Sequence, residues 1–133
     1  MKNQNFFSNL FCAATLLSLV LSLSGFSYTP HTAVPELEGT WAVDLRPSPD
    51  SPPYIQNMVI TSAKNKQIKG TFYGTKIMNG KINTSWGKVV FAFTTEDGSG
   101  VYHTTGELVD GKLTGSTHSL GRGFLTPWTG VRK

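Results

Sequence analysis

Short runs of β-forming residues alternate with turn signals from Leu37 to the end of the chain, and this spacing constrains the fold more than any other feature. From Leu37 onward, no window of twelve residues repeats apolar residues at helical intervals. The strands expected from the pattern are 38–46, 54–63, 67–76, 81–86, 89–96, 101–109, 112–119 and 124–132. Only the Pro-rich connection 47–53 is long. Because closure removes exposed sheet edges, the pattern predicts an all-β domain, a single eight-stranded antiparallel up-and-down β-barrel.

The turn at Asp110–Gly111 sets a register that separates an inward face from an outward face. A two-residue turn there gives the inward pairs Leu108–Leu113, Gly106–Gly115 and Thr104–Thr117, and the outward pairs Glu107–Thr114, Thr105–Ser116 and His103–His118. The neighbouring hairpins extend this phase to the pairs Phe93–Thr104, Phe91–Gly106, Thr117–Thr126 and Gly115–Trp128. Together these pairs predict one continuous interior.

Three further turn signals complete the expected register. A turn at Gly87–Lys88 pairs Trp86 with Val89 and Ile82 with Phe93, a turn at Asn65–Lys66 aligns Val59 with Phe72, and Asn79–Gly80 separates two strands. One conflict remains, since Phe72 and Ile77 share the inward face only if Gly74 forms a bulge.

The last strand is expected to close the barrel against the first. Its inward residues are Phe124, Thr126, Trp128, Gly130 and Arg132. Because its end lies beside the first strand, Arg132 should cover the ring of Trp41 in a cation–π contact. Trp41, Trp128 and Arg132 then form a structural plug at one end, together with Trp86, Val89, Leu108 and Leu113.

These residues carry a family resemblance. Gly39-Thr40-Trp41 on the first strand, with Arg132 on the last, resembles the G-x-W motif and the packed basic residue of the lipocalin (calycin) superfamily. The ending WTGVRK is similar to that of small secreted bacterial lipocalin-like domains. The resemblance covers residues 37–133 and implies a barrel with a basic residue packed across the tryptophan. Avidin-like barrels also begin with G-x-W and stay an alternative.

The amino-terminal segment 1–27 is typical of a secretory signal peptide. Lys2 precedes an apolar stretch, and the small residues Gly25 and Ser27 suit cleavage between Ser24 and Tyr28. An uncleaved membrane anchor is the alternative, but serines dilute the stretch and no Lys/Arg stop-transfer cluster follows it. We therefore expect a secreted or periplasmic protein without a stable membrane anchor after cleavage, with 28–36 as a flexible tether and 37–133 as the barrel domain.

The charge pattern excludes one class of partner. The chain has 12 Lys and Arg against 8 Asp and Glu, and the basic residues are scattered along it without a run. Nucleic acid is therefore not an expected partner.

A candidate ligand site lies at the barrel end opposite the plug, under the loops that contain 47–53 and Arg122. Aromatic and polar side chains gather there, and the expected ligand-binding residues are Asn57, Phe93, Tyr102, Thr104, Thr117 and Phe124. Apolar walls with a few polar groups are typical of a pocket for a small molecule. Because buried hydroxyls need partners, water or ligand is expected to satisfy some of them. The alternative is a barrel filled by its own side chains.

The residues that usually carry catalysis form no convincing set. The sequence shows no Ser–His–Asp constellation, no phosphate-binding glycine loop and no paired carboxylates, so neither an enzyme nor a cofactor is expected. An isomerase or cyclase is the weakest alternative, because no His, Asp or Glu points inward as an acid–base group. His103 and His118 could hold a metal ion geometrically, but they lie on the solvent face and two ligands make a poor site, so no metal is expected.

The sequence thus favours an exported, non-enzymatic binding module for a small apolar or amphipathic ligand. The second hypothesis is a loop-mediated interaction module, such as an inhibitor of an exported hydrolase, in which the rigid Pro-rich loop 47–53 contacts an exported protein partner.

Overall fold

The computed structural model describes residues 32–133, and the predicted signal peptide and cleavage site lie outside the described residues. The strands are β1 Gly39–Asp44, β2 Ile55–Lys64, β3 Gln67–Phe72, β4 Thr75–Lys76, β5 Met78–Asn83, β6 Val89–Asp97, β7 Gly100–Val109, β8 Lys112–Ser119 and β9 Phe124–Arg132. Two short 3-10 helices, η1 Pro35–Leu37 and η2 Leu120–Arg122, lie before β1 and before β9. Within 32–133, no helix is long and apolar enough to cross a membrane.

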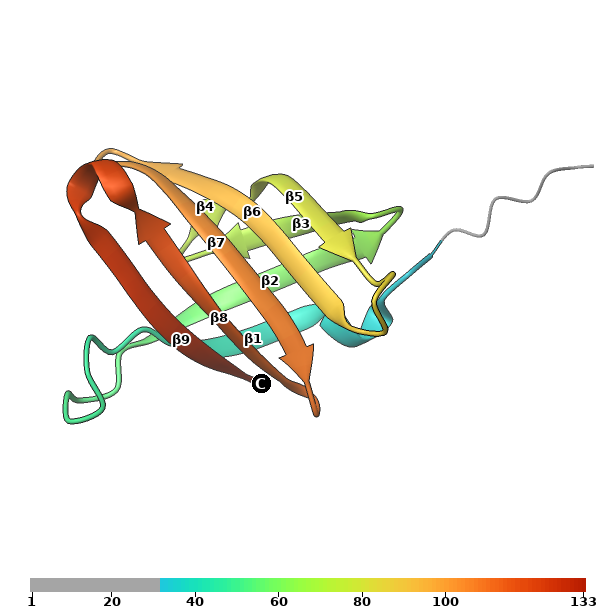
Figure 1. Cartoon of the computed structure of the whole chain (residues 1–133), viewed down its shortest axis with the longest axis horizontal. Helices are drawn as coiled ribbons and strands as arrows, with labels where there is room; N and C mark the ends of the chain where they lie inside the picture. The colour runs from blue at the N-terminus through green and yellow to red at the C-terminus, as the bar shows by residue number, and fades with distance from the viewer. Residues whose placement is uncertain (1–31) are drawn as a thin grey trace, which may run out of the picture.

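All the strands belong to one antiparallel sheet in the order β4-β3-β2-β1-β9-β8-β7-β6-β5. The sheet curls until its two ends meet (Figure 1), where Ile77 N donates to Gly70 O at 2.9 Å and Ile82 N donates to Lys66 O at 3.1 Å. These bonds leave a nearly closed barrel. The predicted all-β up-and-down architecture is confirmed, but the structure has nine strands instead of eight.

The extra strand arises where the predicted strand 67–76 reverses direction. Tyr73 and Gly74 both have positive φ, 55° and 72°, and Phe72 pairs with Thr75. This is a two-residue hairpin and not the predicted bulge at Gly74, because positive φ at both central residues suits a tight antiparallel turn. The reversal buries both Phe72 and Ile77, at 3% and 5% exposure, and so resolves the conflict in the sequence pattern.

The Asn79–Gly80 dipeptide does not form the predicted turn. It lies inside β5, where the register with β6 shifts between Met78 and Lys81. A Cβ at position 80 would lie 2.2 Å from Ile68 O, so Gly80 permits a close approach of β5 to β3. The glycine therefore allows β5 to pack closely against β3 where the sheet closes, and it does not form a hairpin turn.

The predicted turn at Gly87–Lys88 is also wrong. Ile82 pairs with Phe91 instead of Phe93, and the connection is a loop of residues 84–88. Ser85 N donates to Asn83 Oδ1 at 2.8 Å, so the chain leaves the sheet before Trp86. Trp86 is 82% exposed and contributes nothing to the plug.

Strand β2 has the opposite phase to the one predicted for its first half. The Asn65–Lys66 turn is confirmed, but the pairing with β3 shifts between Ile60 and Ser62, so Phe72 pairs with Met58 instead of Val59. The irregularity lets Ile60 and Ala63, three residues apart, both face the core. Asn57 consequently lies on the outer face and is exposed.

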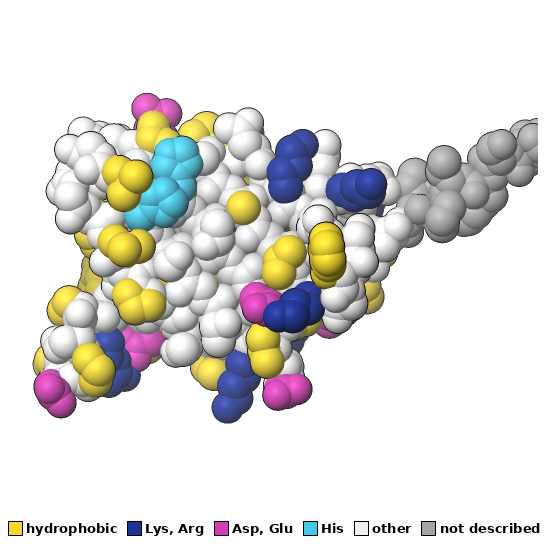
Figure 2. Space-filling model, viewed as in Figure 1, with side chains coloured by type: hydrophobic (Ala, Val, Ile, Leu, Met, Phe, Trp, Pro, Cys, Tyr) yellow, Lys and Arg dark blue, Asp and Glu magenta, His cyan; other side chains and the backbone are white. Residues whose placement is uncertain are grey.

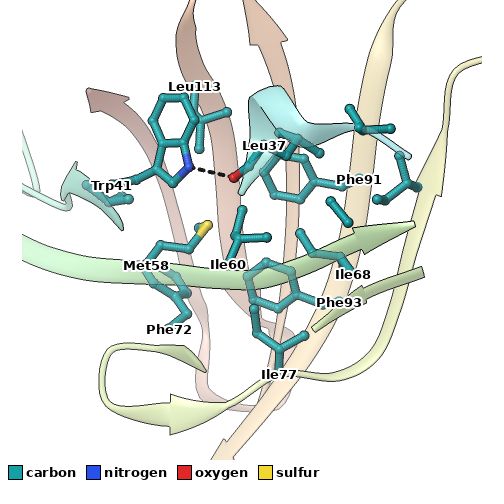
Figure 3. Close-up of a cluster of buried hydrophobic side chains, with 14 of the residues drawn as sticks. Leu37, Trp41, Met58, Ile60, Ile68, Phe72, Ile77, Phe91, Phe93 and Leu113 are labelled. Carbon is teal, nitrogen blue, oxygen red and sulfur yellow. Dashed lines mark hydrogen bonds between the residues drawn. The ribbon is translucent and has the colours of Figure 1, made fainter. Parts of the chain in front are cut away.

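The registers predicted for β6 to β9 are confirmed. The inward pairs include Phe91–Gly106, Phe93–Thr104, Leu108–Leu113, Thr104–Thr117, Gly115–Trp128 and Thr117–Thr126. A Cβ at Gly115 would lie 2.4 Å from the Trp128 ring, so this glycine makes room for the indole. Aromatic rings fill the middle of the barrel (Figure 3), with Phe93 in contact with Phe72 at 5.9 Å and with Phe91 at 6.1 Å between centroids.

One end of the barrel is sealed. Trp41 is fully buried, and its Nε1 donates to Leu37 O at 2.9 Å (Figure 3). Arg132 pairs with Trp41 across β1 and β9, and its guanidinium carbon lies 4.4 Å from the indole centroid, as the sequence predicted. Arg132 also donates to the carbonyl oxygens of Glu36 and Glu38, which fixes η1 over this end.

Contacts with the barrel begin before residue 37. Val34 is 4% exposed and its N–H donates to Ala63 O at 2.8 Å. The described part of the predicted tether therefore packs on the strands.

Candidate functional site

A cavity of about 310 Å³ lies at the end of the barrel opposite the Trp41 plug. Its walls come from the base of the Pro-rich loop, the β3–β4 turn, the end of β6, the start of β7, η2 and the start of β9. The residues that line it are Leu45, Tyr54, Phe72, Tyr73, Thr75, Thr95, Glu96, Asp97, Tyr102, Thr117, Arg122 and Phe124. The cavity thus occupies the predicted open end, and five aromatic rings dominate its walls.

One wall consists of Tyr102, Phe124 and Arg122. The Tyr102 and Phe124 rings meet edge to face with centroids 6.0 Å apart, which is a favourable aromatic arrangement. The guanidinium carbon of Arg122 lies 5.5 Å from the Tyr102 centroid, and Arg122 Nη1 donates to the Tyr102 hydroxyl. Gly123, with φ of 66°, caps η2 and directly precedes β9, so it places Arg122 and Phe124 on the same rim.

The opposite wall consists of Tyr54 and Tyr73. Their rings lie 6.1 Å apart at 60°, and their hydroxyls are hydrogen-bonded to each other. The hydrogen bond to Tyr54 and, second, desolvation raise the pKa of Tyr73. Tyr73 therefore stays a neutral phenol at physiological pH and presents an uncharged, hydrogen-bonding face to the cavity.

The floor of the cavity is packed and internally hydrogen-bonded. Thr117 Oγ1 lies 2.9 Å from Thr104 Oγ1, and Trp128 Nε1 donates to Thr117 Oγ1 at 3.1 Å. Within residues 32–133, every buried side-chain nitrogen and oxygen has a hydrogen-bond partner. The expectation that water or ligand must satisfy these hydroxyls is therefore wrong, because other side chains and the backbone satisfy them.

The Pro-rich loop is fastened at its base beside the cavity. Asp44 accepts hydrogen bonds from the Arg46 side chain, with Nε 2.8 Å away, and from Tyr54 N at 3.2 Å. The hydrogen bonds from Arg46 lower the pKa of Asp44 to about 2. Leu45 N also donates to Tyr54 O at 2.9 Å. The carboxylate thus ties both ends of the loop together.

The rim carries charges of both signs. Arg122 faces a rim that also includes Glu96 and Asp97. Asp97 has a local role in addition, because its Oδ1 accepts from Ser99 N at 2.7 Å, which supports the predicted turn between β6 and β7. Over the described range 32–133, no three His, Cys, Asp or Glu residues are close enough to hold a metal ion.

The structure brings together half of the predicted ligand-binding residues. Tyr102, Thr117 and Phe124 line the cavity. Phe93 and Thr104 are buried below it, at 3% and 1% exposure, and do not reach its surface. Asn57 was predicted to point inward, and this was wrong because of the β2 phase described above.

Sequence reasoning missed Leu45, Tyr54 and Tyr73. The signals were present, since Tyr54 follows the prolines of the loop directly and Tyr73 precedes Gly74 at a turn. Two tyrosines at strand ends on the same end of a barrel are positioned for its mouth.

Comparison of the chain with family models, with curated proteins and with solved structures gives no significant match. The fold itself is compatible with a lipocalin-like barrel.

Proposed function

We propose that this protein is a lipocalin-like binding module that takes a small, flat amphipathic molecule into the aromatic cavity at the open end of its barrel. The observation that carries the proposal is the cavity of about 310 Å³ between the Tyr54–Tyr73 wall and the Tyr102–Phe124 wall. Two aromatic walls with few polar groups favour a compact aromatic ligand.

The size of the cavity supports a small ligand. Pockets for small molecules begin at roughly 300 Å³. A long acyl chain needs further depth, and Phe72, Phe93 and Trp128 occupy that space in the middle of the barrel. A compact aromatic molecule fits the available volume better than a fatty acid.

The polar groups suggest how such a ligand is oriented. Arg122 donates one hydrogen bond to Tyr102, and a guanidinium carries five N–H donors in total. A single acceptor group on the ligand, such as a carboxylate or sulfonate, would therefore meet Arg122. Glu96 and Asp97 on the same rim disfavour a ligand with several negative charges.

Titration with the fluorescent probe 8-anilinonaphthalene-1-sulfonate tests the proposal. Tyr102→Ala should weaken probe binding about tenfold, or ~1.4 kcal/mol, because one aromatic wall is lost. Trp86→Ala is the matched control, since this aromatic residue is exposed at the other end. Unchanged binding in both Tyr102→Ala and Phe124→Ala would place the probe elsewhere and reject the pocket.

We further propose membership in the lipocalin superfamily and export by the 1–27 signal. The Arg132 contact over Trp41 of the Gly39-Thr40-Trp41 motif supports the first, and the sequence pattern supports the second. Amino-terminal sequencing of the protein recovered from outside the cytoplasm should find a new terminus between Ser24 and Tyr28. An intact Met1 on that material would contradict export by cleavage.

A loop-mediated interaction with an exported protein is the second candidate. The braced Pro-rich loop supports it, because this loop projects beyond the barrel (Figure 1) and is held by Asp44, Arg46 and a Ser48–Ser51 contact. Replacement of residues 48–52 by Gly and Ser should then abolish inhibition of a susceptible exported hydrolase and leave probe binding unchanged. Inhibition that survives this replacement would rule the loop out.

A further inference from the structure

A pair of histidines lies on the outer wall of the barrel, separate from the cavity. His103 on β7 and His118 on β8 are direct register partners, and their ring centroids are 5.3 Å apart with planes inclined by 24°. The two rings form one continuous patch on the surface (Figure 2). Their chain neighbours Thr104 and Thr117 point inward, so the sheet separates the histidines from the interior.

The spacing of the rings matches that of a shared metal ion. Two imidazole nitrogens that lie about 2.0–2.1 Å from one tetrahedral ion place their ring centroids roughly 5 Å apart. The observed 5.3 Å is close to this separation. The rings are stacked in the structure, so binding of an ion requires both side chains to rotate until one nitrogen of each points to the ion.

The residues around the two histidines are mostly apolar. His103 and His118 line a shallow hollow together with Val101 and Leu120. Val101, Leu120 and Leu125 are large exposed hydrophobic residues, at 40%, 76% and 68% exposure, and Leu125 pairs with His118. Because these neighbours are apolar, the two imidazoles are the main side chains in the hollow that can coordinate a metal ion.

The charged residues nearest the pair are of both signs. Glu96 pairs with Val101, so it lies on the same outer face and diagonally from His103. Arg122 borders the hollow, but its guanidinium is hydrogen-bonded to Tyr102 in the cavity. Farther along β7, Glu107 is paired with Lys88 at 3.2 Å.

We propose that His103 and His118 form a two-ligand site for a divalent transition-metal cation, with water in the remaining coordination positions. Imidazole suits Zn²⁺, Ni²⁺ and Cu²⁺, and Cu²⁺ should bind most tightly. Mg²⁺ and Ca²⁺ should not bind, because they prefer oxygen ligands. The sequence alone argued against a metal here, and the observed ring spacing changes that assessment.

Titration with Ni²⁺ alone tests the site. The protein should carry His31→Ala and no polyhistidine tag, so that His103 and His118 are its only histidines. Because the ion links two strands of the folded state, free Ni²⁺ at about 100 times Kd should raise Tm by on the order of 10 °C. Paramagnetic broadening of NMR signals should be centred on His103, His118, Thr94 and Leu125.

The variants His103→Gln and His118→Gln should each abolish the Ni²⁺-induced rise in Tm. Thr105→Ala is the matched control, since Thr105 is the next outward residue on β7 and should leave the rise intact. Circular dichroism and Tm without metal establish that each variant is folded. The site is wrong if millimolar Ni²⁺ gives no rise, or if either histidine variant keeps it.

Discussion

The two ends of this barrel use similar residues for opposite purposes. Trp41 and Arg132 meet at one end and Tyr102 and Arg122 at the other, each as an aromatic ring covered by a guanidinium. Trp41 is fully buried, whereas Phe124 beside Tyr102 is 40% exposed and Tyr73 across the cavity is 49% exposed.

The difference lies in the segment that covers each end. Helix η1 packs over the Trp41 end and offers Leu37 O to the indole, while the Pro-rich loop at the other end projects away from the barrel (Figure 1). An aromatic–arginine pair thus seals its end of the barrel where a backbone segment packs over it, and borders an open cavity where no segment within residues 32–133 does. The following predictions test this contrast in order of expected effect.

The largest effect is expected at the sealed end. Trp41→Ala should cost about 3–5 kcal/mol of unfolding free energy, because it leaves a large cavity and an unpaired Leu37 carbonyl. Tyr102→Ala should cost much less, since its ring borders an existing cavity. Chemical denaturation of both variants measures the difference in unfolding free energy. Equal losses would show that the two ends of the barrel contribute equally to stability.

The boundary between the two ends is the Thr104–Thr117–Trp128 network. Thr117→Val should cost about 1–3 kcal/mol, because Trp128 Nε1 and Thr104 Oγ1 both lose a buried partner. Thr105→Val, on the outer face, is the control. The prediction fails if the two variants unfold at the same denaturant concentration.

Arg132 at the sealed end should matter more for stability, and Arg122 at the open end should matter more for ligand binding. Arg132→Ala should lower the unfolding free energy by about 0.5–2 kcal/mol, which is the range for a cation–π contact. The same change removes the hydrogen bonds from Arg132 to the backbone carbonyls of η1 and its C-cap. Arg122→Ala should change stability less and probe binding more. Thermal melts and probe titrations of both variants separate the roles, and reversed results would contradict them.

The loop brace should make the open end acid-sensitive. The folded state lowers the pKa of Asp44 from 3.8 to about 2, so it favours the carboxylate. The resulting stabilisation is complete above about pH 4 and is lost as the pH falls towards 2. Asp44→Asn should therefore flatten the decline of Tm over this interval, and an unchanged pH profile would show that the brace contributes nothing.

The smallest effect is expected for the tryptophan outside both ends. Trp86→Ala should change unfolding free energy by less than about 0.5 kcal/mol, as is usual for an exposed loop residue. A loss of unfolding free energy comparable to that of Trp41→Ala would show that Trp86 is part of the plug, as the sequence pattern predicted.

The sequence by itself determined the wall from β6 to β9 and the contact that closes it. Asp110–Gly111 fixes one register, and strict alternation of residue type then assigns each side chain to a face. Arg132 could be placed over Trp41 because the last strand of a closed barrel must pair with the first. Tyr102, Thr117 and Phe124 of the candidate site follow from the same phase.

Only the tertiary structure decided the seam at β2 to β5. Asn79–Gly80 reads locally as a hairpin turn, yet closure of the barrel needs a glycine where β5 approaches Ile68 O, and Tyr73–Gly74 makes the reversal instead. Local turn signals are degenerate, since the same positive φ serves a turn or a bulge. Burial of Phe72 and Ile77 on one face selects between them, and that long-range packing also sets the phase of β2, which turns Asn57 outward.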